Sequence, residues 1–516
     1  MTRPAVSIIG AGPGDPRLIT VYGLECLRAA DVVVYDHLIP RRLLAHARAG
    51  AELIDVGTAA PQPMAQEAIS YLLVEKAREG KVVARLKWGD PFVFDRGGEE
   101  ALFLHEQRVP FEVVPGIPAG IGVPAYAGVP VSYPGAGDTI TLVRGYEDES
   151  RLPPEVDWAS LARLDGTVVC YAGAHQLPRI LDAMRASGWS ADTQGVVIYN
   201  GTLPNQETLS GTIAELADIV HDTRRRAASL LVVGRVTGLR EHLRWYDARP
   251  LFGRRVLVTR AREQAGELAD RLAALGAEPV EAPVIRIAPP EDRGPLLVAA
   301  ATPAAFDWIV FTSANAVDAF MQAVLEGGRD VRALSGPKLC TVGPGTADRL
   351  AQYGVKVDLI PEEFRAEGVL RALAGTGRME GLRVLLPRAD IGREVIADEL
   401  RRAGAVVSDV VAYRTVLEDS LPEQGPDVYG MLLQGQIDVV TFTSASAVRG
   451  FARIYGAEQA TDLLEHTVVA VIGPTTAEAA RQAGFPVTVQ PSASTVPALV
   501  DAIVAHYAQV KSTKTV

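Results

Sequence analysis

Short apolar runs alternate with stretches of helical spacing along almost the whole chain. The runs "AVSIIG", "DVVVYD" and "KVVARLK" are strand-like. Between the first two, residues 16–30 carry leucine and isoleucine at roughly helical spacing. Strands that alternate with helices in this way predict an α/β fold with mostly parallel sheets.

The pattern breaks at residues 246–253, "YDARPLFG", where Pro250 and Gly253 precede a fresh strand-like run. Beyond this break the chain repeats itself. The motifs "VLVTRA", "FTSANAV" and "VGPGTA" return in the same order as "VLLPRA", "FTSASAV" and "IGPTTA", at a nearly constant spacing of about 130 residues. Residues 253–516 are therefore expected to form two similar α/β units, and two such units usually enclose a ligand-binding cleft.

Each repeat places hydroxyl side chains just after a strand and just before an alanine-rich helical stretch. In the simplest interpretation these hydroxyls cap helices. Open helix N-termini also bind anions through backbone N–H groups, so four such termini favour a polyanionic ligand in the cleft. Arginines that follow apolar strands, Arg414 among them, either bind ligand carboxylates or form structural ion pairs. The candidate substrate-binding residues are Arg260, Ser313, Thr346, Arg388, Ser444, Thr475 and Thr476.

Tyr413 in "VVAYRT" ends an apolar run and is either a proton donor or a packed core tyrosine. The sequence of this half contains no Ser-His-Asp arrangement, metal-binding cluster or phosphate-binding loop. We therefore expect its chemistry to need little acid–base machinery.

The turn "GAGPGDP" at residues 10–16 follows the first strand, as a dinucleotide-binding turn would. Asp15 stands where the third glycine of that fingerprint belongs, and a carboxylate there would repel a pyrophosphate. Asp36, at the end of "DVVVYD", imitates the ribose-binding acid of such a unit, so the motif alone leaves the dinucleotide alternative open. Three more Gly/Pro turns follow strands, in residues 86–100, 113–130 and 199–206, and they are either tight connections or parts of one site.

Composition narrows the classes of function. The 516 residues suffice for three or four domains of about 150 residues. A net charge of −11 argues against non-specific nucleic-acid binding. Three cysteines and eight histidines are scattered, so we expect neither disulfide nor metal site, and a reducing, cytoplasmic setting. The chain enters a strand at once and has no apolar run of about 18 residues, so we expect no signal peptide and no membrane span.

The repeated motifs and "VVAYRT" resemble uroporphyrinogen-III synthase over residues 253–516. The resemblance implies a two-domain protein that closes on hydroxymethylbilane, removes water, inverts ring D and cyclises the chain to uroporphyrinogen III. It implies that Tyr413 protonates the leaving hydroxyl. It also implies a discontinuous first domain, about 253–287 plus 415–516, with about 290–412 as the inserted domain.

The motifs "GAGPGDPRLIT", "GDPFVF", "PAYAGVP" and "NGT" resemble the tetrapyrrole methylases, most closely uroporphyrinogen-III C-methyltransferase, over roughly residues 4–246. The resemblance implies two α/β subdomains, about 1–115 and 116–248, with S-adenosylmethionine between them. It implies methylation of uroporphyrinogen III to precorrin-2, towards sirohaem and cobalamin, with Asp36 as the base, although a turn acid is the alternative. The cofactor-binding residues that it implies are Pro13, Gly89, Asp90, Val93, Ala119, Ala172 and Gly201.

The methylase pocket departs from the family's pattern at five positions. Trp88, Asp95, Pro118, Ala172 and Thr58 stand where the family has glycine, glycine, threonine, methionine and lysine. We expect the indole of Trp88 to occupy the space that the methionine leaves at Ala172, so that S-adenosylmethionine still binds. In the alternative, Trp88 blocks the pocket and this half is silent.

Together these features predict a bifunctional enzyme, with residues 1–248 as methylase and 249–516 as synthase. We expect tetrapyrroles as small-molecule partners, S-adenosylmethionine as methyl donor, no metal, no nucleic acid and no membrane, and the methylase half allows a homodimer. Three alternatives stay open. They are an active synthase with a degenerate methylase half that acts as a binding or scaffolding module, a two-lobed periplasmic-type binding protein over 253–516, and a flavin or nicotinamide enzyme.

Overall fold

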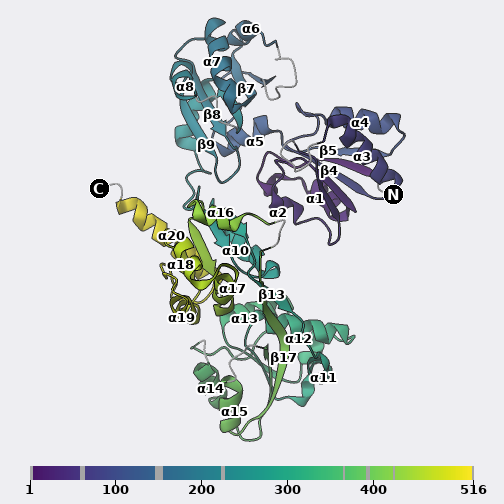
Figure 1. The fold of residues 1–516 in the computed structure, drawn as a ribbon, viewed down its shortest axis with the longest axis vertical. Coiled ribbons are helices and arrows are strands. Elements are labelled where there is room, and N and C mark those ends of the chain that lie inside the picture. Colours follow the sequence, from purple (N-terminus) through teal and green to yellow (C-terminus); the bar gives the residue numbers. More distant parts are fainter. Residues whose placement is uncertain are drawn as a thin grey trace. The chain divides into compact units, whose positions relative to one another are not determined.

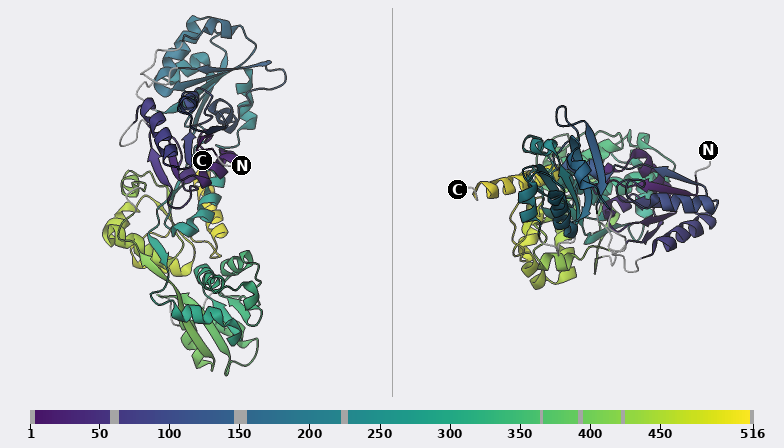
Figure 2. Two further views of the ribbon diagram at one scale, coloured as in Figure 1. Left: turned by 90° about the vertical axis from the view of Figure 1, so that its right-hand side faces the viewer. Right: turned by 90° about the horizontal axis from the view of Figure 1, so that it is seen from above.

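The computed structural model describes residues 4–57, 64–145, 155–221, 227–363, 366–390, 395–421 and 425–513. Thr58 lies outside these ranges. The chain divides into two compact units, residues 1–253 and 254–516, and helices flank the sheets in each (Figures 1 and 2). Among the described residues, no helix is long and apolar enough to cross a membrane.

The first sheet of the first unit is fully parallel, in the order β3-β2-β4-β1-β5. Its central strands are buried on both faces, which explains their continuous apolar runs. The stretch 16–30, whose apolar residues have roughly helical spacing, forms two elements, because Asp15 caps a short 3₁₀ turn, Pro16–Leu18, and Thr20 caps α1 separately. The elements are β1 Val6–Gly10, α1 Val21–Ala29, β2 Val32–Tyr35, α2 Arg41–Leu44, β3 Glu52–Asp55, α3 Gln66–Arg78, β4 Val83–Lys87, α4 Gly97–Glu106 and β5 Phe111–Val114.

The second sheet of this unit has the order β6-β7-β10-β8-β9, and only β6 and β7 pair in parallel. The expectation of mostly parallel sheets is therefore wrong here. The loop 200–206 joins β8 directly to β9 without a crossover helix, so the two strands run antiparallel. The elements are α5 Ala119–Tyr126, β6 Thr139–Arg144, α6 Trp158–Ala162, β7 Gly166–Gly173, α7 Leu177–Ala186, β8 Gln194–Tyr199, β9 Glu207–Thr212, α8 Ile213–Ile219, β10 Ala228–Val233 and α9 Arg240–Leu243.

The second unit contains two sheets of matching design, β12-β11-β18-β19 and β13-β17-β16-β14-β15. All pairs are parallel except β13 with β17. Its elements are β11 Arg255–Val258, α10 Arg262–Ala274, β12 Glu278–Glu281, β13 Ile285–Ala288, α11 Gly294–Ala301, β14 Trp308–Phe311, α12 Ala314–Glu326, β15 Lys338–Thr341, α13 Pro344–Gln352, α14 Ala366–Ala374, β16 Arg383–Ala389, α15 Val395–Arg402, β17 Val406–Leu417, α16 Val428–Leu433, β18 Val439–Phe442, α17 Ala445–Tyr455, α18 Ala457–Leu463, β19 Val468–Val471, α19 Pro474–Gln482 and α20 Val496–Thr513.

Each of these sheets takes strands from both sequence repeats. Strand β11 of the first repeat pairs with β18 of the second, and β14 of the first pairs with β16 of the second. The likeness extends to single contacts: the Arg255 N–H donates to Asp438 at 2.8 Å, and the Arg383 N–H donates to Asp307 at 2.8 Å. The chain thus builds two similar folds by exchanging one strand–helix–strand segment between the repeats.

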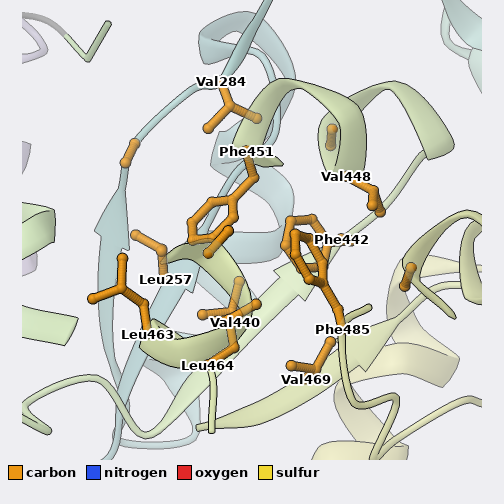
Figure 3. Close-up of a cluster of buried hydrophobic side chains, with 14 of the residues drawn as sticks. Leu257, Val284, Val440, Phe442, Val448, Phe451, Leu463, Leu464, Val469 and Phe485 are labelled. Atoms are coloured by element: carbon orange, nitrogen blue, oxygen red, sulfur yellow. The ribbon is translucent and has the colours of Figure 1, made fainter. Parts of the chain in front are cut away.

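The core beneath the β11–β18 sheet shows how these strands are held. Phe442 on β18 meets Phe451 of α17 edge-on, and the Phe442 ring stacks with Phe485 (Figure 3). These three rings lie among buried aliphatic side chains from both ends of the unit, Leu257 and Val469 among them. Burying each such side chain stabilises the folded state by about 1.5–3 kcal/mol, and this holds the two distant segments together.

Candidate functional site

The candidate methylase site lies where strands of the first unit end. Because β1, β4 and β5 are parallel neighbours, the loops that follow them meet at one edge of the sheet. The loops after β1 and β4 pair with each other: the Gly12 N–H donates to Gly89 O at 3.2 Å, and the Gly89 N–H donates to Gly12 O at 2.8 Å. Both glycines have positive φ, +78° and +70°, which favours glycine at this close approach.

Helix α5 brings the other loops to the same place. A Cβ atom added to Gly89 would lie 3.6 Å from the backbone nitrogen of Ala119, the first residue of α5. The ring of Pro13 lies against Gly122, and Gly201 lies against Val123, both on α5. The structure therefore gathers Pro13, Gly89, Ala119 and Gly201 around one helix.

Asp90 stabilises this arrangement through hydrogen bonds to both of its carboxylate oxygens. Oδ1 accepts from the Phe92 N–H at 2.8 Å, and Oδ2 accepts from the Gly116 N–H at 3.0 Å. Asp90 thus joins the loop after β4 to the loop after β5. In this structure its side chain supports the loops that bear the other candidates.

Ala172 and Trp88 do not share a space. Successive residues of a strand face opposite sides of the sheet, and Tyr171 and Ala172 on β7 belong to different hydrophobic clusters. Trp88 and Val93 pack against the cluster that contains Ala119 and Tyr171. The expectation that the Trp88 indole fills the volume left at Ala172 is therefore wrong.

Asp15, which departs from the dinucleotide fingerprint, is buried and fully engaged. Its carboxylate accepts from the Arg17 backbone N–H at 2.9 Å, pairs with the Arg17 guanidinium and accepts from the Tyr126 hydroxyl at 2.9 Å. Burial raises the pKa of Asp15, but the hydrogen bonds with Arg17 outweigh it and hold the pKa below its usual value. The aspartate is therefore a structural cap of the turn.

Asp36, the candidate base, borders a buried ionic cluster that sequence reasoning missed. Arg85 donates to Asp36 Oδ1 at 2.6 Å, and Lys87 Nζ lies 3.9 Å from Asp36 Oδ2. Both cations also pair with Glu100, which is 0% exposed. Arg85 and Lys87 stand two apart on β4, so they face the same side, and that spacing within an apolar run was the available signal.

Asp95, which stands where the family has glycine, joins the same cluster. Its carboxylate lies 3.1 Å from Lys87 Nζ. Burial raises the pKa of Asp95 above its usual value, and the Lys87 ammonium opposes this shift. The ammonium of Lys87 thus lies among three carboxylates, those of Asp36, Asp95 and Glu100.

In the second unit the structure brings Ser313 and Tyr413 together. The Ser313 hydroxyl caps α12 by accepting from the Ala316 N–H at 3.2 Å, and it lies 3.1 Å from the Tyr413 hydroxyl. Tyr413 on β17 is 8% exposed. Burial raises the pKa of its phenol, against the opposite effect of hydrogen bonds with Ser313 and Asn315. The phenol is therefore protonated at neutral pH and able to donate.

The other hydroxyls divide into caps and residues inside the first turn. Ser444 caps α17 by accepting from the Ala447 N–H at 3.1 Å, as Ser313 caps α12. Helices α13 and α19 instead begin at glycine caps, Gly343 and Gly473, each followed by proline. The capping interpretation is therefore wrong for Thr346 and Thr476, which are buried, and for Thr475, which is exposed.

The candidate arginines differ in their places and in their partners. Arg388 lies near the end of β16, whereas Arg414 lies within β17, opposite Ala288, and does not follow a strand as expected. Arg388 pairs with Asp409 through two contacts, 2.6 and 3.1 Å. Arg414 pairs with Glu291 at 2.6 Å. Arg260 is half-buried at the end of β11, and burial lowers the pKa of its guanidinium. Ala389, the residue after Arg388, pairs with Tyr413 in the strand register, so Arg388 lies near Tyr413. The charge of Arg388 is balanced by Asp409.

Within the described part of the chain, no group of histidine, cysteine, aspartate or glutamate side chains is arranged to hold a metal ion.

Comparisons with known proteins find a different family in each of the two compact units. Residues 5–217 match the family of tetrapyrrole (corrin/porphyrin) methylases, and residues 266–501 match uroporphyrinogen-III synthase HemD. The porphyrin biosynthesis protein HemD of Ruminiclostridium josui is 36% identical over 484 residues, 93% of this chain and 94% of that protein. The S-adenosyl-L-methionine-dependent uroporphyrinogen III methyltransferase of Methanosarcina barkeri is 41% identical over 46% of this chain and 94% of that protein.

Among solved structures, the uroporphyrin-III C-methyl transferase of Thermus thermophilus complexed with S-adenyl homocysteine has a TM-score of 0.40 and 32% identity. The match covers 46% of this chain and 100% of that chain. The two matching families and the near full-length likeness to the Ruminiclostridium protein show that the chain belongs to the family of that HemD protein and is an enzyme in which a tetrapyrrole methylase is fused to a uroporphyrinogen-III synthase.

Proposed function

We propose that the chain cyclises hydroxymethylbilane to uroporphyrinogen III with inversion of ring D, and that it then methylates this product to precorrin-2 with S-adenosylmethionine. The observation that carries the proposal is the protonated, buried phenol of Tyr413 beside the capped N-terminus of α12. A proton donor next to an anion-binding helix end suits a polycarboxylate substrate that must lose a hydroxyl group.

In the proposed synthase reaction, Tyr413 donates its proton to the hydroxyl of hydroxymethylbilane, and water leaves. The N-termini of α12, α13, α17 and α19 bind the carboxylates through backbone N–H groups, helped by Arg260 and by hydroxyls of Ser313, Thr346, Ser444, Thr475 and Thr476. Arg388 contributes positive potential at the end of β16, although Asp409 holds its guanidinium.

In the proposed methylase reaction, S-adenosylmethionine supplies an electrophilic methyl group to an electron-rich ring carbon. The loops that bear Gly89 and Gly201 converge on α5 near Ala119, where the absence of side chains allows close approach of the main chain, although Val123 fills the space beside Gly201. Pro13, Asp90 and Val93 complete the proposed pocket, and Ala172, whose side chain faces the other side of β7, would contribute through its backbone. Asp36, held by Arg85, then takes the ring proton, while positioning supplies much of the rate.

The alternative is an active synthase whose methylase half only binds or scaffolds. The packing of Trp88, directly before Gly89, against the cluster that contains Ala119 favours this alternative, because an indole there narrows the approach to the pocket. Calorimetric titration of the full chain with S-adenosylhomocysteine separates the two. Binding, together with methyl transfer to uroporphyrinogen III, supports the methylase. Absence of binding that Trp88→Gly restores would show a blocked pocket and overturn the methyltransferase proposal.

We further propose that the methylase (1–248) and the synthase (249–516) fold and act separately, with the synthase built from about 253–287 plus 415–516 and an inserted domain of about 290–412. Residue contacts divide at Gly253, and this supports separate expression of 1–253 and 254–516. The second fragment should be soluble and should form the type III isomer from hydroxymethylbilane. An insoluble second fragment would contradict the proposed independence. We also propose a cytoplasmic enzyme on the route to sirohaem or cobalamin, and a homodimer formed through the methylase half.

A further inference from the structure

The segment 245–252, which leads out of the first unit, is folded back onto that unit. Tyr246 is 3% exposed, and its ring lies 4.7 Å from the ring of Tyr126 and 5.3 Å from that of Phe252. The Arg249 guanidinium lies over the rings of Trp245 and Tyr246, at 4.6 and 4.9 Å. The segment is therefore an ordered part of the first unit and not a loose tether.

The hydroxyl of Tyr246 contacts the loop that carries Gly201. This hydroxyl donates to the backbone carbonyl of Thr202 at 2.9 Å. Thr202 is buried and has a φ of +68°, and Asn200 in the same loop has a φ of +49°. Left-handed conformations at residues other than glycine cost about 1–3 kcal/mol and persist only where the surroundings hold them.

Thr202 is held at each of its polar atoms. Its N–H donates to Gln206 Oε1 at 2.8 Å, its hydroxyl accepts from the Asp15 N–H at 3.0 Å, and its carbonyl accepts from Tyr246. Tyr126, which packs on Tyr246, donates to the Asp15 carboxylate at 2.9 Å. Asp15 is two residues from Pro13, so one hydrogen-bonded network joins the Pro13 loop, the Gly201 loop and the segment 245–252.

We infer that Tyr246 is a positioning residue of the methylase site, which holds the Gly201 loop in the conformation that binds S-adenosylmethionine. The inference rests on the proposed function, because it takes Pro13 and Gly201 as cofactor contacts. Without the Tyr246 hydroxyl, the buried Thr202 carbonyl loses its donor and the strained loop relaxes. The binding-competent fraction then falls, and apparent affinity falls by the same factor.

The test uses the full chain with Tyr246→Phe, which keeps the ring and removes one hydrogen bond. We expect the dissociation constant for S-adenosylhomocysteine to rise about tenfold, which is the effect of losing one buried hydrogen bond. The KM for S-adenosylmethionine should rise with it, while the KM for uroporphyrinogen III and the synthase rate stay unchanged. Tyr71→Phe is the matched control, because Tyr71 is an exposed tyrosine on α3.

A second measurement begins with the unaltered chain. Because coupling between two sites is reciprocal, S-adenosylhomocysteine should slow amide hydrogen exchange in residues 245–252 of the unaltered chain. The slowing should be lost in Tyr246→Phe. Equal affinity in both proteins, or no slowing in the unaltered chain despite binding, would overturn the inference. No binding of S-adenosylhomocysteine by the unaltered chain would instead contradict the proposed methylase function.

Discussion

The two sheets of the second unit present nearly the same helix N-terminus, and the Tyr413 hydroxyl lies beside the one that follows β14. After β14, Ser313 caps α12 with φ −159° and ψ 159°, and after β18, Ser444 caps α17 with φ −158° and ψ 156°. The caps accept from the N–H three residues later at 3.2 and 3.1 Å. What the two repeats share is therefore the local chemistry that begins a helix and leaves its N–H groups open.

The difference between the two repeats lies on the strands that pack against these helices, β17 against α12 and β13 against α17. The spacing that relates "VLVTRA" to "VLLPRA" takes Tyr413 to Ile285. Tyr413 packs with α12 and reaches Ser313, whereas Ile285 packs in the apolar cluster with α17. Both positions are buried, and a phenol in place of an aliphatic side chain distinguishes the candidate catalytic site from the corresponding place in the other repeat. The proposed function therefore predicts that both sheets contribute to substrate binding and that the sheet with Tyr413 supplies the proton.

The largest effect is expected from removing that hydroxyl. Tyr413→Phe keeps the packed ring and leaves the Ser313 cap in place, so a general-acid role predicts a synthase rate lower by about 10²–10⁴-fold. The measurement is the initial rate of type III uroporphyrinogen formation, with Tyr429→Phe, an exposed tyrosine of the same unit, as control. A rate within about threefold of the unaltered chain is far below that range and would reduce Tyr413 to a core residue.

A tyrosine at the symmetric position should not replace it. Ile285→Tyr adds volume and a hydroxyl to a buried apolar cluster, and we expect a loss of about 1–3 kcal/mol in the free energy of unfolding. Denaturant unfolding measures this loss. Combined with Tyr413→Phe it should restore no synthase activity, because the rest of the site lies beside α12. Recovery of the rate in the double variant would mean that the two sheets are functionally equivalent.

Substitution of the two capping serines should change stability and synthase rate by smaller amounts. Ser313→Ala and Ser444→Ala each remove a helix cap, so each should lower the free energy of unfolding by about 1 kcal/mol. Ser313→Ala should also slow the synthase by about tenfold, because Tyr413 loses one of its hydrogen-bond partners. Ser444→Ala should slow it less, since the open N–H groups of α17 remain. Equal slowing by the two variants would show that Tyr413 needs no positioning by Ser313.

The pH dependence should be nearly flat on the alkaline side. Burial raises the pKa of Tyr413, and its protonated form is the active one, so this group stays active until the pH exceeds the ordinary tyrosine value of about 10. The synthase rate, corrected for spontaneous cyclisation, should therefore show no loss from this residue between about pH 7 and 9. An alkaline decline within that window that disappears in Tyr413→Phe would contradict the assignment.

The same comparison shows what a sequence can and cannot predict. The alternation of strands and helices and the Ser313 and Ser444 caps are local patterns, and the repeat can be recognised by comparing the sequence with itself. For this reason the α/β fold and these helix starts could be predicted. The partner of Arg388 and the distance from Ser313 to Tyr413 depend on strands far apart in the chain, and no local pattern fixes them. The error at Trp88 and Ala172 was avoidable in part, because neighbours on a strand such as Tyr171 and Ala172 must face opposite sides.

The central claim is that one chain closes the ring and then methylates it, and product analysis tests it most directly. The purified chain is incubated with hydroxymethylbilane, with and without S-adenosylmethionine, and the products are separated by isomer and mass. We predict the type III isomer of uroporphyrinogen without the methyl donor, and its conversion to a dimethylated product when the donor is present. Formation of the type I isomer alone would contradict the synthase, and a type III product that gains no methyl groups would contradict the methylase.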